Sequence, residues 1–335
     1  MEKKIKVAIV GCGDFARGVH LPNIATNSKY QLYAACDIVE ERAKEVAEKY
    51  QMAYATDDYQ KVLKDSQVDL VVITTRHDLH AQQTIQAAQA KKHILCEKPM
   101  ALNLNDCYEV MRAVRDNGVK YTIGYNRALA PLVRKAKGIL QDKNKPVVIY
   151  HRMANFIPPD HWLLDEKTGG GRVVGEGCHV LDLFCALTDS EPVRLYAEGG
   201  VFTQDKADAV ADTQVVTLSF QNNSLATMLL SSVGNSGAPK ESTEIFSDRT
   251  TIFIDDFKEM RVWDGDLPVQ TVSLPSQDKG HALEIDLLAD AILNDTPPPN
   301  GPENACRAAL LSFKVLEAIK THQVQAVEKA QYTIT

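Results

Sequence analysis

The sequence contains no tract of lysine or arginine and no long apolar run. Its 335 residues include 37 basic and 44 acidic side chains, which gives a net charge of −7. Nucleic acid and anionic membranes are therefore poor partners for this chain. No stretch approaches the ~20 apolar residues of a membrane-spanning helix, and the run Ile5–Val10 is shorter than a signal-peptide core of roughly 7–15 residues.

Paired cysteine spacings, internal repeats and low-complexity segments are also missing. The seven cysteines are an odd number and stand mostly in apolar segments, which is typical of reduced thiols rather than of disulfides or a zinc site. We therefore expect no metal and a cytoplasmic location. The composition, 44% hydrophobic and 24% charged, is that of a globular protein. At roughly 150 residues per domain, the length predicts two domains.

The first third of the sequence alternates between strand-like and helix-like segments. Strands are expected at Ile5–Val10, Leu32–Cys36, Val68–Thr74, His93–Cys96 and Val119–Ile123. Helices are expected at Asp14–Asn27, Glu40–Tyr50, His77–Ala90 and Asn105–Asn117. This alternation predicts an α/β domain over residues 1–124, with a parallel sheet between two layers of helices.

The remaining sequence, residues 125–335, has a different texture. Its strand candidates alternate apolar and polar residues, at Val193–Gly199, Thr213–Phe220, Ser224–Leu230, Thr243–Phe246 and Thr251–Ile254. Such alternation predicts a mostly antiparallel sheet with one exposed face. Helices are expected at Val173–Leu187, Ala282–Leu293 and Glu303–Lys320, and the last of these could pack back on the first domain.

A glycine-rich motif follows the first expected strand and opens the first expected helix. The segment Gly11-Cys12-Gly13-Asp14-Phe15-Ala16 fits the pattern G-x-G-x-x-G/A. Gly11 allows a tight turn, Gly13 lets the backbone approach a pyrophosphate, and Ala16 lets the helix pack closely on the strand. The free amides at the helix N-terminus would then hold the phosphates. The alternative is a glycine turn required only for packing.

Asp37 strengthens the prediction of a dinucleotide site. It ends the second expected strand and lies 21 residues after Ala16. In dinucleotide-binding domains, the acidic residue that binds the ribose is expected about 20 residues after the glycine motif. A carboxylate there repels a 2′-phosphate, and no arginine follows it. We therefore expect NAD rather than NADP, although Asp37 could also be a simple turn residue.

Two further segments carry candidate catalytic residues. Glu97-Lys98-Pro99 follows the strand His93–Cys96, at the sheet edge where ligands bind in open α/β folds. If Val173–Leu187 is helical, Glu176, His179 and Asp182 share one face, and the carboxylates could orient a histidine base. The alternatives are a surface lysine and a structural hydrogen-bond network.

Taken together, these motifs resemble the Gfo/Idh/MocA oxidoreductase family over nearly the whole chain. The resemblance also includes His20, the Thr74–His80 segment and Gly124-Tyr125-Asn126-Arg127. It implies an N-terminal Rossmann domain and a C-terminal α/β domain with an open, mostly antiparallel sheet that often forms oligomer interfaces. It also implies hydride transfer between a nicotinamide and a secondary alcohol carbon of a sugar, inositol or sugar derivative, in a homodimer or homotetramer.

The resemblance further implies roles for particular residues. Lys98 would bind the substrate hydroxyl, His179 would take its proton, and Glu97 would touch the nicotinamide ribose. The Lys98–Pro99 bond is expected to be cis. Cofactor contacts are implied for the glycine loop (Gly11, Gly13, Asp14, Phe15, Ala16) and for Asp37, Thr74, Thr75, His80, Glu97, Lys98 and Asn126. Substrate contacts are expected for Lys98, Tyr125, Arg152, Trp162, His179 and Asp182.

Some features depart from the family pattern. Many members carry an aspartate four residues before the helix histidine, where this chain has Gly175, followed by Glu176. Glu176 either replaces that aspartate in catalysis or only packs. Two other functions remain open: a redox-neutral sugar-modifying enzyme with tightly bound NAD, and a non-catalytic ligand sensor. The presence of both Lys98 and His179 argues against a sensor.

Overall fold

A computed structural model describes residues 4–203 and 209–334. The chain forms two compact units. The first contains the chain up to Gly124 together with His281–Cys306, and the second contains Tyr125–Gly280 and Arg307–Thr333. The sequence had assigned everything after residue 124 to one domain. The segment His281–Cys306 instead belongs to the first unit, where the Tyr30 hydroxyl donates to the Ile285 carbonyl at 2.8 Å.

The first unit is built on a six-stranded parallel sheet with the strand order β3-β2-β1-β4-β5-β6. The strands are β1 (Ile5–Val10), β2 (Tyr30–Cys36), β3 (Tyr54–Thr56), β4 (Leu70–Ile73), β5 (His93–Cys96) and β6 (Tyr121–Ile123). The helices are α1 (Leu21–Thr26), α2 (Glu40–Lys49), α3 (Tyr59–Lys64), α4 (His80–Gln89), α5 (Leu104–Asn117) and α8 (His281–Leu293). Because every residue of β4 is buried, its apolar run is covered on both faces.

Local sequence signals fix the ends of several of these helices. The side chain of Asn103 caps α5 by accepting from the Asp106 amide at 2.9 Å, and Gly118 ends the same helix in the left-handed conformation. The first helix of the chain is less regular than expected. A π-turn over Ala16–His20 precedes α1, so His20 is the last residue of that turn.

The second unit is built on a nine-stranded mixed, mostly antiparallel sheet with the order β14-β13-β12-β11-β7-β10-β9-β8-β15. Its strands are β7 (Val148–Ala154), β8 (Pro192–Gly200), β9 (Thr213–Phe220), β10 (Leu225–Ser231), β11 (Glu241–Ser247), β12 (Thr250–Asp255), β13 (Glu259–Asp264), β14 (Gln270–Ser273) and β15 (Gln325–Ala326). Among the described strands of this sheet, only β7 and β10 pair in parallel. The two sheets confirm the expected fold class.

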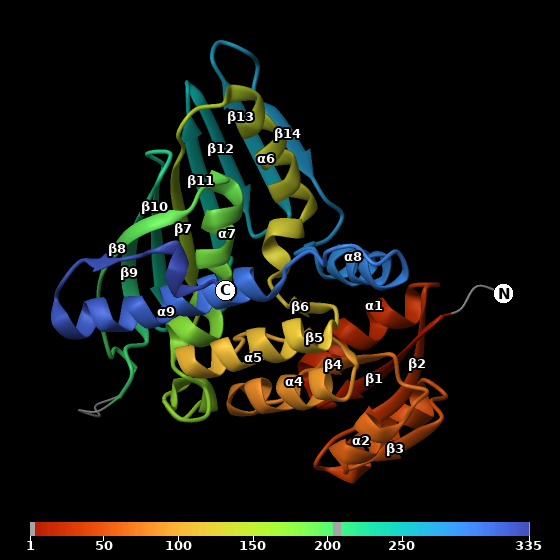
Figure 1. The fold of residues 1–335 in the computed structure, drawn as a ribbon. Helices are drawn as coiled ribbons and strands as arrows, with labels where there is room; N and C mark the ends of the chain where they lie inside the picture. Colours follow the sequence, from red (N-terminus) through yellow and green to blue (C-terminus); the bar gives the residue numbers. More distant parts are fainter. Residues whose placement is uncertain (1–3, 204–208, 335) are drawn as a thin grey trace. The chain divides into compact units, whose positions relative to one another are not determined.

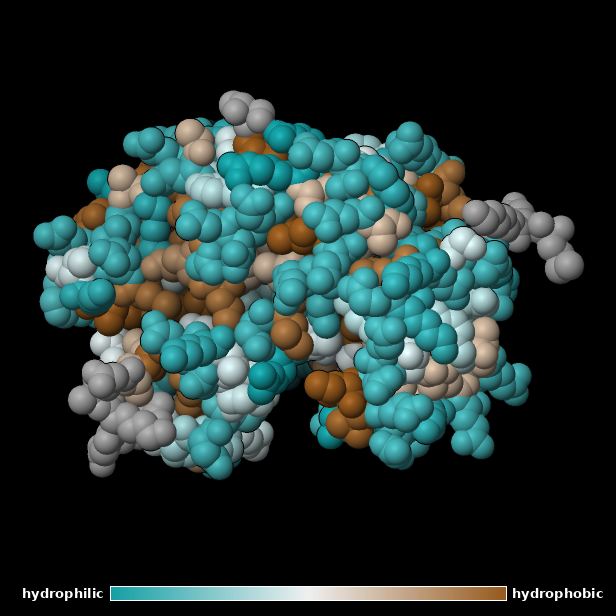
Figure 2. Space-filling model, turned by 60° about the horizontal axis from the view of Figure 1, so that its bottom comes forward, coloured by the Kyte–Doolittle hydropathy of each residue, from teal (hydrophilic) through white to brown (hydrophobic). Residues whose placement is uncertain are grey.

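Helices α6 (Pro131–Lys143) and α7 (Cys178–Thr188) lie in front of this sheet in Figure 1. The ring of Phe184 in α7 contacts His151 of β7 edge to face, with ring centroids 6.4 Å apart. The helix α9 (Pro302–Thr321) begins in the first unit and continues into the second. Among the described residues, no helix is both long and apolar enough to cross a bilayer. Hydrophilic side chains dominate the face shown in Figure 2, with hydrophobic residues in smaller patches between them.

Candidate active site

The glycine loop at the carboxyl end of β1 contains two glycines, and the structure explains the glycine at each position differently. At Gly11, φ is +91°, and a Cβ would lie 2.7 Å from the Thr74 carbonyl oxygen, so the fold itself requires glycine there. At Gly13 a Cβ would have no atom within 4 Å. The protein therefore leaves open space beside Gly13, as expected where a pyrophosphate approaches the backbone.

Asp37 lies directly beside this loop. Its carboxylate accepts hydrogen bonds from the Cys12 amide at 2.6 Å and from the Val39 amide at 2.8 Å. Thr74, at the end of β4, donates its hydroxyl to the Gly11 carbonyl at 2.6 Å. The loop, the acidic residue and Thr74 are thus brought together at one sheet edge, as the sequence predicted. Burial, together with the charge of Asp37, raises the pKa of the Cys12 thiol to about 12.

Phe15 and Asp14 begin the helical segment after the loop, and both are exposed. The Phe15 ring packs edge to face against His20, with centroids 5.3 Å apart, and against His281 at 5.9 Å. The structure places His281 in the same unit, where its charge also acts on Glu97.

Glu97 follows β5 and forms a buried pair with His20. Nε2 of His20 lies 2.8 Å from Oε1 of Glu97, and the two side chains are 0% and 8% exposed. Burial alone would raise the pKa of Glu97, but the hydrogen bond from His20 and the charges of His20, Lys98 and His281 outweigh it and hold that pKa below its usual value. The carboxylate is therefore ionised at neutral pH.

The rest of the segment after β5 is also held in place. The Lys98 amide donates to Oε2 of Glu97 at 3.3 Å, and the Lys98–Pro99 bond is cis, as expected. Nδ1 of His80 lies 2.7 Å from the Pro99 carbonyl oxygen, and its Nε2 lies 3.1 Å from the Thr75 carbonyl oxygen. Burial lowers the pKa of His80, so its ring is neutral. Both ring nitrogens of this predicted cofactor residue thus contact backbone carbonyls.

These residues fit a dinucleotide. A glycine turn with open space at a helix start and the Asp37 carboxylate beside that turn are features of dinucleotide sites, and Lys98 lies at the carboxyl edge of the same sheet. Thr75 also lies at this edge and donates its hydroxyl to Gln83 at 2.6 Å.

His179 is in the second unit, in the first turn of α7, and is 6% exposed. The ring of Tyr125 packs edge to face against it, with centroids 5.8 Å apart, so the structure brings these two predicted residues together. Asn126 follows Tyr125 and donates its amide to the Lys279 carbonyl at 2.7 Å.

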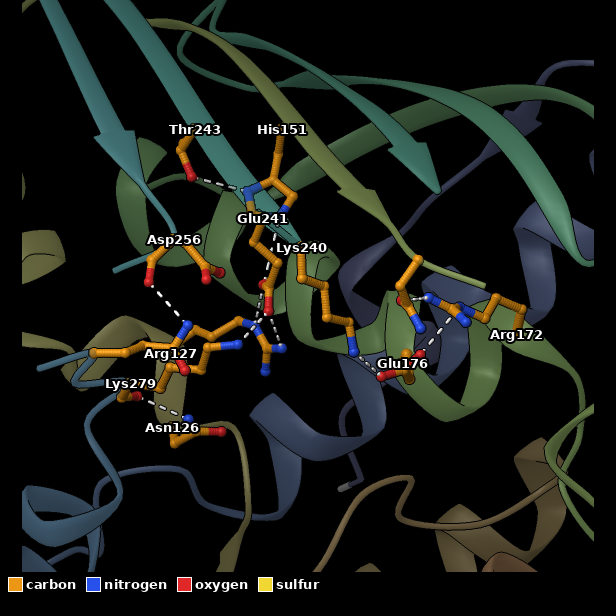
Figure 3. Close-up of polar contacts among 12 residues, drawn as sticks. Asn126, Arg127, His151, Arg172, Glu176, Lys240, Glu241, Thr243, Asp256 and Lys279 are labelled. Atoms are coloured by element: carbon orange, nitrogen blue, oxygen red, sulfur yellow. Dashed lines mark hydrogen bonds and ion pairs between the residues drawn. The ribbon is translucent and has the colours of Figure 1, made fainter. Parts of the chain in front are cut away.

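The start of this helix differs from the regular α-helix that the sequence predicted. Residues Val173–Gly177 form a π-turn, which contains Gly175 and Gly177. Glu176 within that turn lies between two cations: its Oε1 accepts from Lys240 at 2.6 Å, and its Oε2 is 3.0 Å from Nε of Arg172 (Figure 3). The carboxylate of Glu176 is therefore engaged with residues that the sequence did not single out.

Glu241, next to Lys240 at the start of β11, is the centre of a second ionic group. Arg127 binds its carboxylate through two hydrogen bonds of 2.7 and 2.8 Å, and Lys279 adds a third at 2.7 Å. Figure 3 shows these side chains converging from separate segments of the unit. Burial would raise the pKa of Glu241, but the charge of Arg127 and the hydrogen bonds hold it well below its usual value. No local pattern in the sequence indicates this pairing, which joins residues 114 positions apart.

Three other predicted substrate residues have different environments. Arg152 alternates along β7 with His151, whose ring contacts α7, so Arg152 points to the opposite face and donates to the Pro239 carbonyl at 3.0 Å. The structure therefore does not bring Arg152 together with His179. Trp162 is 39% exposed and stacks on His161. Asp182 is buried, and burial raises its pKa to about 7 against the opposing charge of Arg307.

Comparison with known proteins shows the same two-part organisation. Residues 5–125 match the model of the oxidoreductase family with an NAD-binding Rossmann fold, and residues 134–253 match the GFO/IDH/MocA C-terminal domain. The chain is 28% identical over 293 residues to the uncharacterized oxidoreductase YrbE of Bacillus subtilis, covering 87% of this chain and 84% of that protein. It is 27% identical over 263 residues to myo-inositol 2-dehydrogenase of Thermotoga maritima, covering 77% of each.

Solved structures agree on the fold. An oxidoreductase domain protein from Kribbella flavida superposes with a TM-score of 0.88 at 18% identity, over 98% of this chain and 100% of that one. Aldose-aldose oxidoreductase from Caulobacter crescentus superposes with a TM-score of 0.86 at 23% identity, over 97% and 100%. With matched models over both the glycine-loop domain and the sheet domain that carries His179, the chain belongs to the Gfo/Idh/MocA family of NAD-binding oxidoreductases.

Proposed function

We propose that this protein is an NAD-dependent dehydrogenase that oxidises a secondary alcohol carbon of a sugar, inositol or sugar derivative. The observation that carries this proposal is the fixed Glu97-Lys98-Pro99 segment at the carboxyl end of β5, within the domain that holds the glycine loop. Similarity to a myo-inositol 2-dehydrogenase supports the same substrate class.

In this proposal, Lys98 binds and polarises the hydroxyl oxygen of the substrate, and His179 accepts the hydroxyl proton. Bound NAD supplies the hydride acceptor. Tyr125 holds the His179 ring through their edge-to-face contact. Glu176 is fixed by Lys240 and Arg172 and sets the charge near His179, which lies three residues further along the chain. Asn126, Trp162 and Asp182 are proposed to contact the cofactor or substrate.

The preference for NAD over NADP rests on Asp37. Its carboxylate is held at the glycine loop by two backbone amides, and the next two residues, Ile38 and Val39, offer no cation for a 2′-phosphate. The ribose hydroxyls would donate to this carboxylate. The negative charge of this carboxylate would repel the 2′-phosphate of NADP.

The substrate is proposed to be uncharged. The two ionic groups around Glu176 and Glu241 contain four cations, Arg127, Arg172, Lys240 and Lys279. Four carboxylates interact with them: Glu176, Glu241, Asp212 and Asp256. Because these charges balance, the group has no excess positive charge to recognise a phosphate or carboxylate, and it suits a polyol.

We propose a homodimer or homotetramer that uses the open face of the nine-stranded sheet. Phe246 of β11 lies opposite Val148 of β7, and Val148 lies opposite Leu225 of β10. These three side chains are 40–50% exposed and form an apolar row across the sheet. A cytoplasmic location is part of the proposal and is supported by seven buried free thiols.

The proposal is tested by two replacements, Lys98→Ala and His179→Ala. Each is expected to abolish NADH formation while NAD affinity stays within about threefold of the wild type, because both residues act on the substrate proton. His93→Gln, at the other end of β5, is the control and should retain activity. Substantial turnover by either alanine variant would show that the proton route is misassigned.

A further inference from the structure

We propose that His20 and His80 are positioning residues that bracket Lys98 from two sides, and this inference rests on the proposed role of Lys98. The Lys98 bracket consists of His20 on the Glu97 carboxylate and His80 on the Pro99 carbonyl. Neither histidine needs to touch substrate in this arrangement. Each acts through a neighbour of Lys98.

The first side of the bracket is the His20–Glu97 pair. Since the Glu97 carboxylate is ionised, Nε2 of His20 carries the proton and donates it across 2.8 Å. Among the described residues Nδ1 of His20 has no hydrogen-bond partner, so Glu97 is the polar contact that this ring serves. The other carboxylate oxygen of Glu97 accepts a hydrogen bond from the backbone amide of Lys98 itself. The position of His20 is set by the π-turn Ala16–His20, a distortion that is frequent at functional sites.

The second side of the bracket is His80 on Pro99. His80 is 0% exposed and opens α4, which follows β4, the strand next to β5 in the sheet. A neutral ring has one N–H, and we assign it to Nδ1, whose contact of 2.7 Å with the Pro99 oxygen is the shorter of the two. The ring therefore ties the backbone after Lys98 to the neighbouring strand–helix unit.

The two contacts fix the segment on both sides of Lys98. Lys98 is partly exposed, whereas Glu97 and Pro99 on either side are buried. Its backbone is thus fixed at both neighbours, which sets the point from which its side chain extends. Preorganisation of this kind favours catalysis because small displacements of a reacting group reduce the rate steeply.

The test uses matched pairs of variants. His80→Leu removes the donor, whereas His80→Asn places an amide nitrogen near the position of Nδ1. His20→Leu removes the donor to Glu97, whereas His20→Gln places one near the position of Nε2. We expect each leucine variant to lower kcat about tenfold or more with the Kd for NAD within about threefold, and the amide variants to recover most of the loss.

A second readout does not depend on turnover. The pH dependence of Lys98 labelling by an amine-reactive anhydride, measured by peptide mass spectrometry, should shift in the leucine variants and return in the amide variants. Labelling of the exposed Lys64 should not change. The bracket would be overturned if the leucine variants bind NAD and keep both the wild-type kcat and the wild-type labelling profile. It would also be overturned if the leucine variants lose NAD binding in parallel with kcat.

The two proposals fail in different ways. If the wild type oxidises no sugar or polyol, the proposed function fails, and the labelling profile alone decides on the bracket. If the wild type is active but the leucine variants match it, only the bracket fails.

Discussion

Gly124, the residue after β6, lies against the carboxylate of Glu97: a Cβ on Gly124 would be 2.6 Å from Oε1 and 3.0 Å from Cδ. Glycine at this position thus leaves the room that the buried Glu97–His20 pair needs. The Cβ of any other residue would push Glu97 away from His20 or force the strand end to shift.

Gly124→Ala is therefore expected to reduce turnover by about tenfold or more, with a smaller effect on stability, because it displaces Glu97 and with it the Lys98 amide. Steady-state kinetics and urea unfolding measure the two effects. Gly138→Ala in α6, where a Cβ meets nothing within 4 Å, is the control and should leave kcat unchanged. Equal activity of the two variants would contradict the account.

The two glycines of the loop should separate folding from cofactor binding. Gly11→Ala places a Cβ against the Thr74 carbonyl at a positive φ and is expected to lower the free energy of unfolding by about 1–3 kcal/mol. Gly13→Ala fills only open space, so it should leave the free energy of unfolding unchanged and weaken the binding of NAD. Calorimetric titration with NAD and urea unfolding of both variants test this. A Gly13→Ala protein with wild-type affinity would mean that no phosphate approaches there.

Asp37→Asn should narrow the preference for NAD over NADP. The asparagine oxygen can still accept from the Cys12 amide, so the loop keeps its 2.6 Å contact while the charge that repels a 2′-phosphate is removed. The Kd values for both cofactors provide the measurement. Asp58→Asn, at the N-cap of α3, is a matched control at another acidic turn. An unchanged ratio of the two Kd values would refute the assignment of Asp37.

Asp182 predicts a pH dependence of stability. The pKa of Asp182 in the folded protein is about 7, above the value of about 3.9 in an unfolded chain. The contribution of its protonated carboxyl group to the free energy of unfolding is therefore fully present below pH 4 and is lost as the pH rises through 7. Asp182→Asn should therefore be more stable than the wild type at pH 8, on the order of 4 kcal/mol, and similar to it near pH 4. Urea unfolding at the two pH values is the measurement. A difference that does not depend on pH would exclude burial of the charge as the cause.

Much of the first unit was predictable because its signals are local. The strands β1 and β5 coincide with the predicted residues, and the glycine loop and Asp37 lie together as their spacing indicated. The short β3 and α3 were missed, since three and six residues provide little periodicity. Helix α6 was missed despite buried residues at helical spacing, Leu132, Val133, Ala136 and Leu140, and that pattern could have revealed it.

The candidate site was less predictable where it depends on long-range contacts. Strand alternation shows that His151 and Arg152 point to opposite faces, but it does not show which face α7 covers. Likewise, nothing local pairs Arg127 with Glu241 or Lys240 with Glu176. The π-turn at Val173–Gly177 also alters the regular spacing on which the predicted shared face of Glu176, His179 and Asp182 relied.

The most direct test of the central claim is NADH formation when the purified protein and NAD meet a panel of inositols, free sugars, glycosides and nucleotide sugars. The account predicts NADH with at least one uncharged polyol or sugar, and none when Lys98 is replaced by alanine. Silence across the panel from a protein that demonstrably binds NAD would contradict the proposed dehydrogenase and favour a redox-neutral enzyme or a sensor.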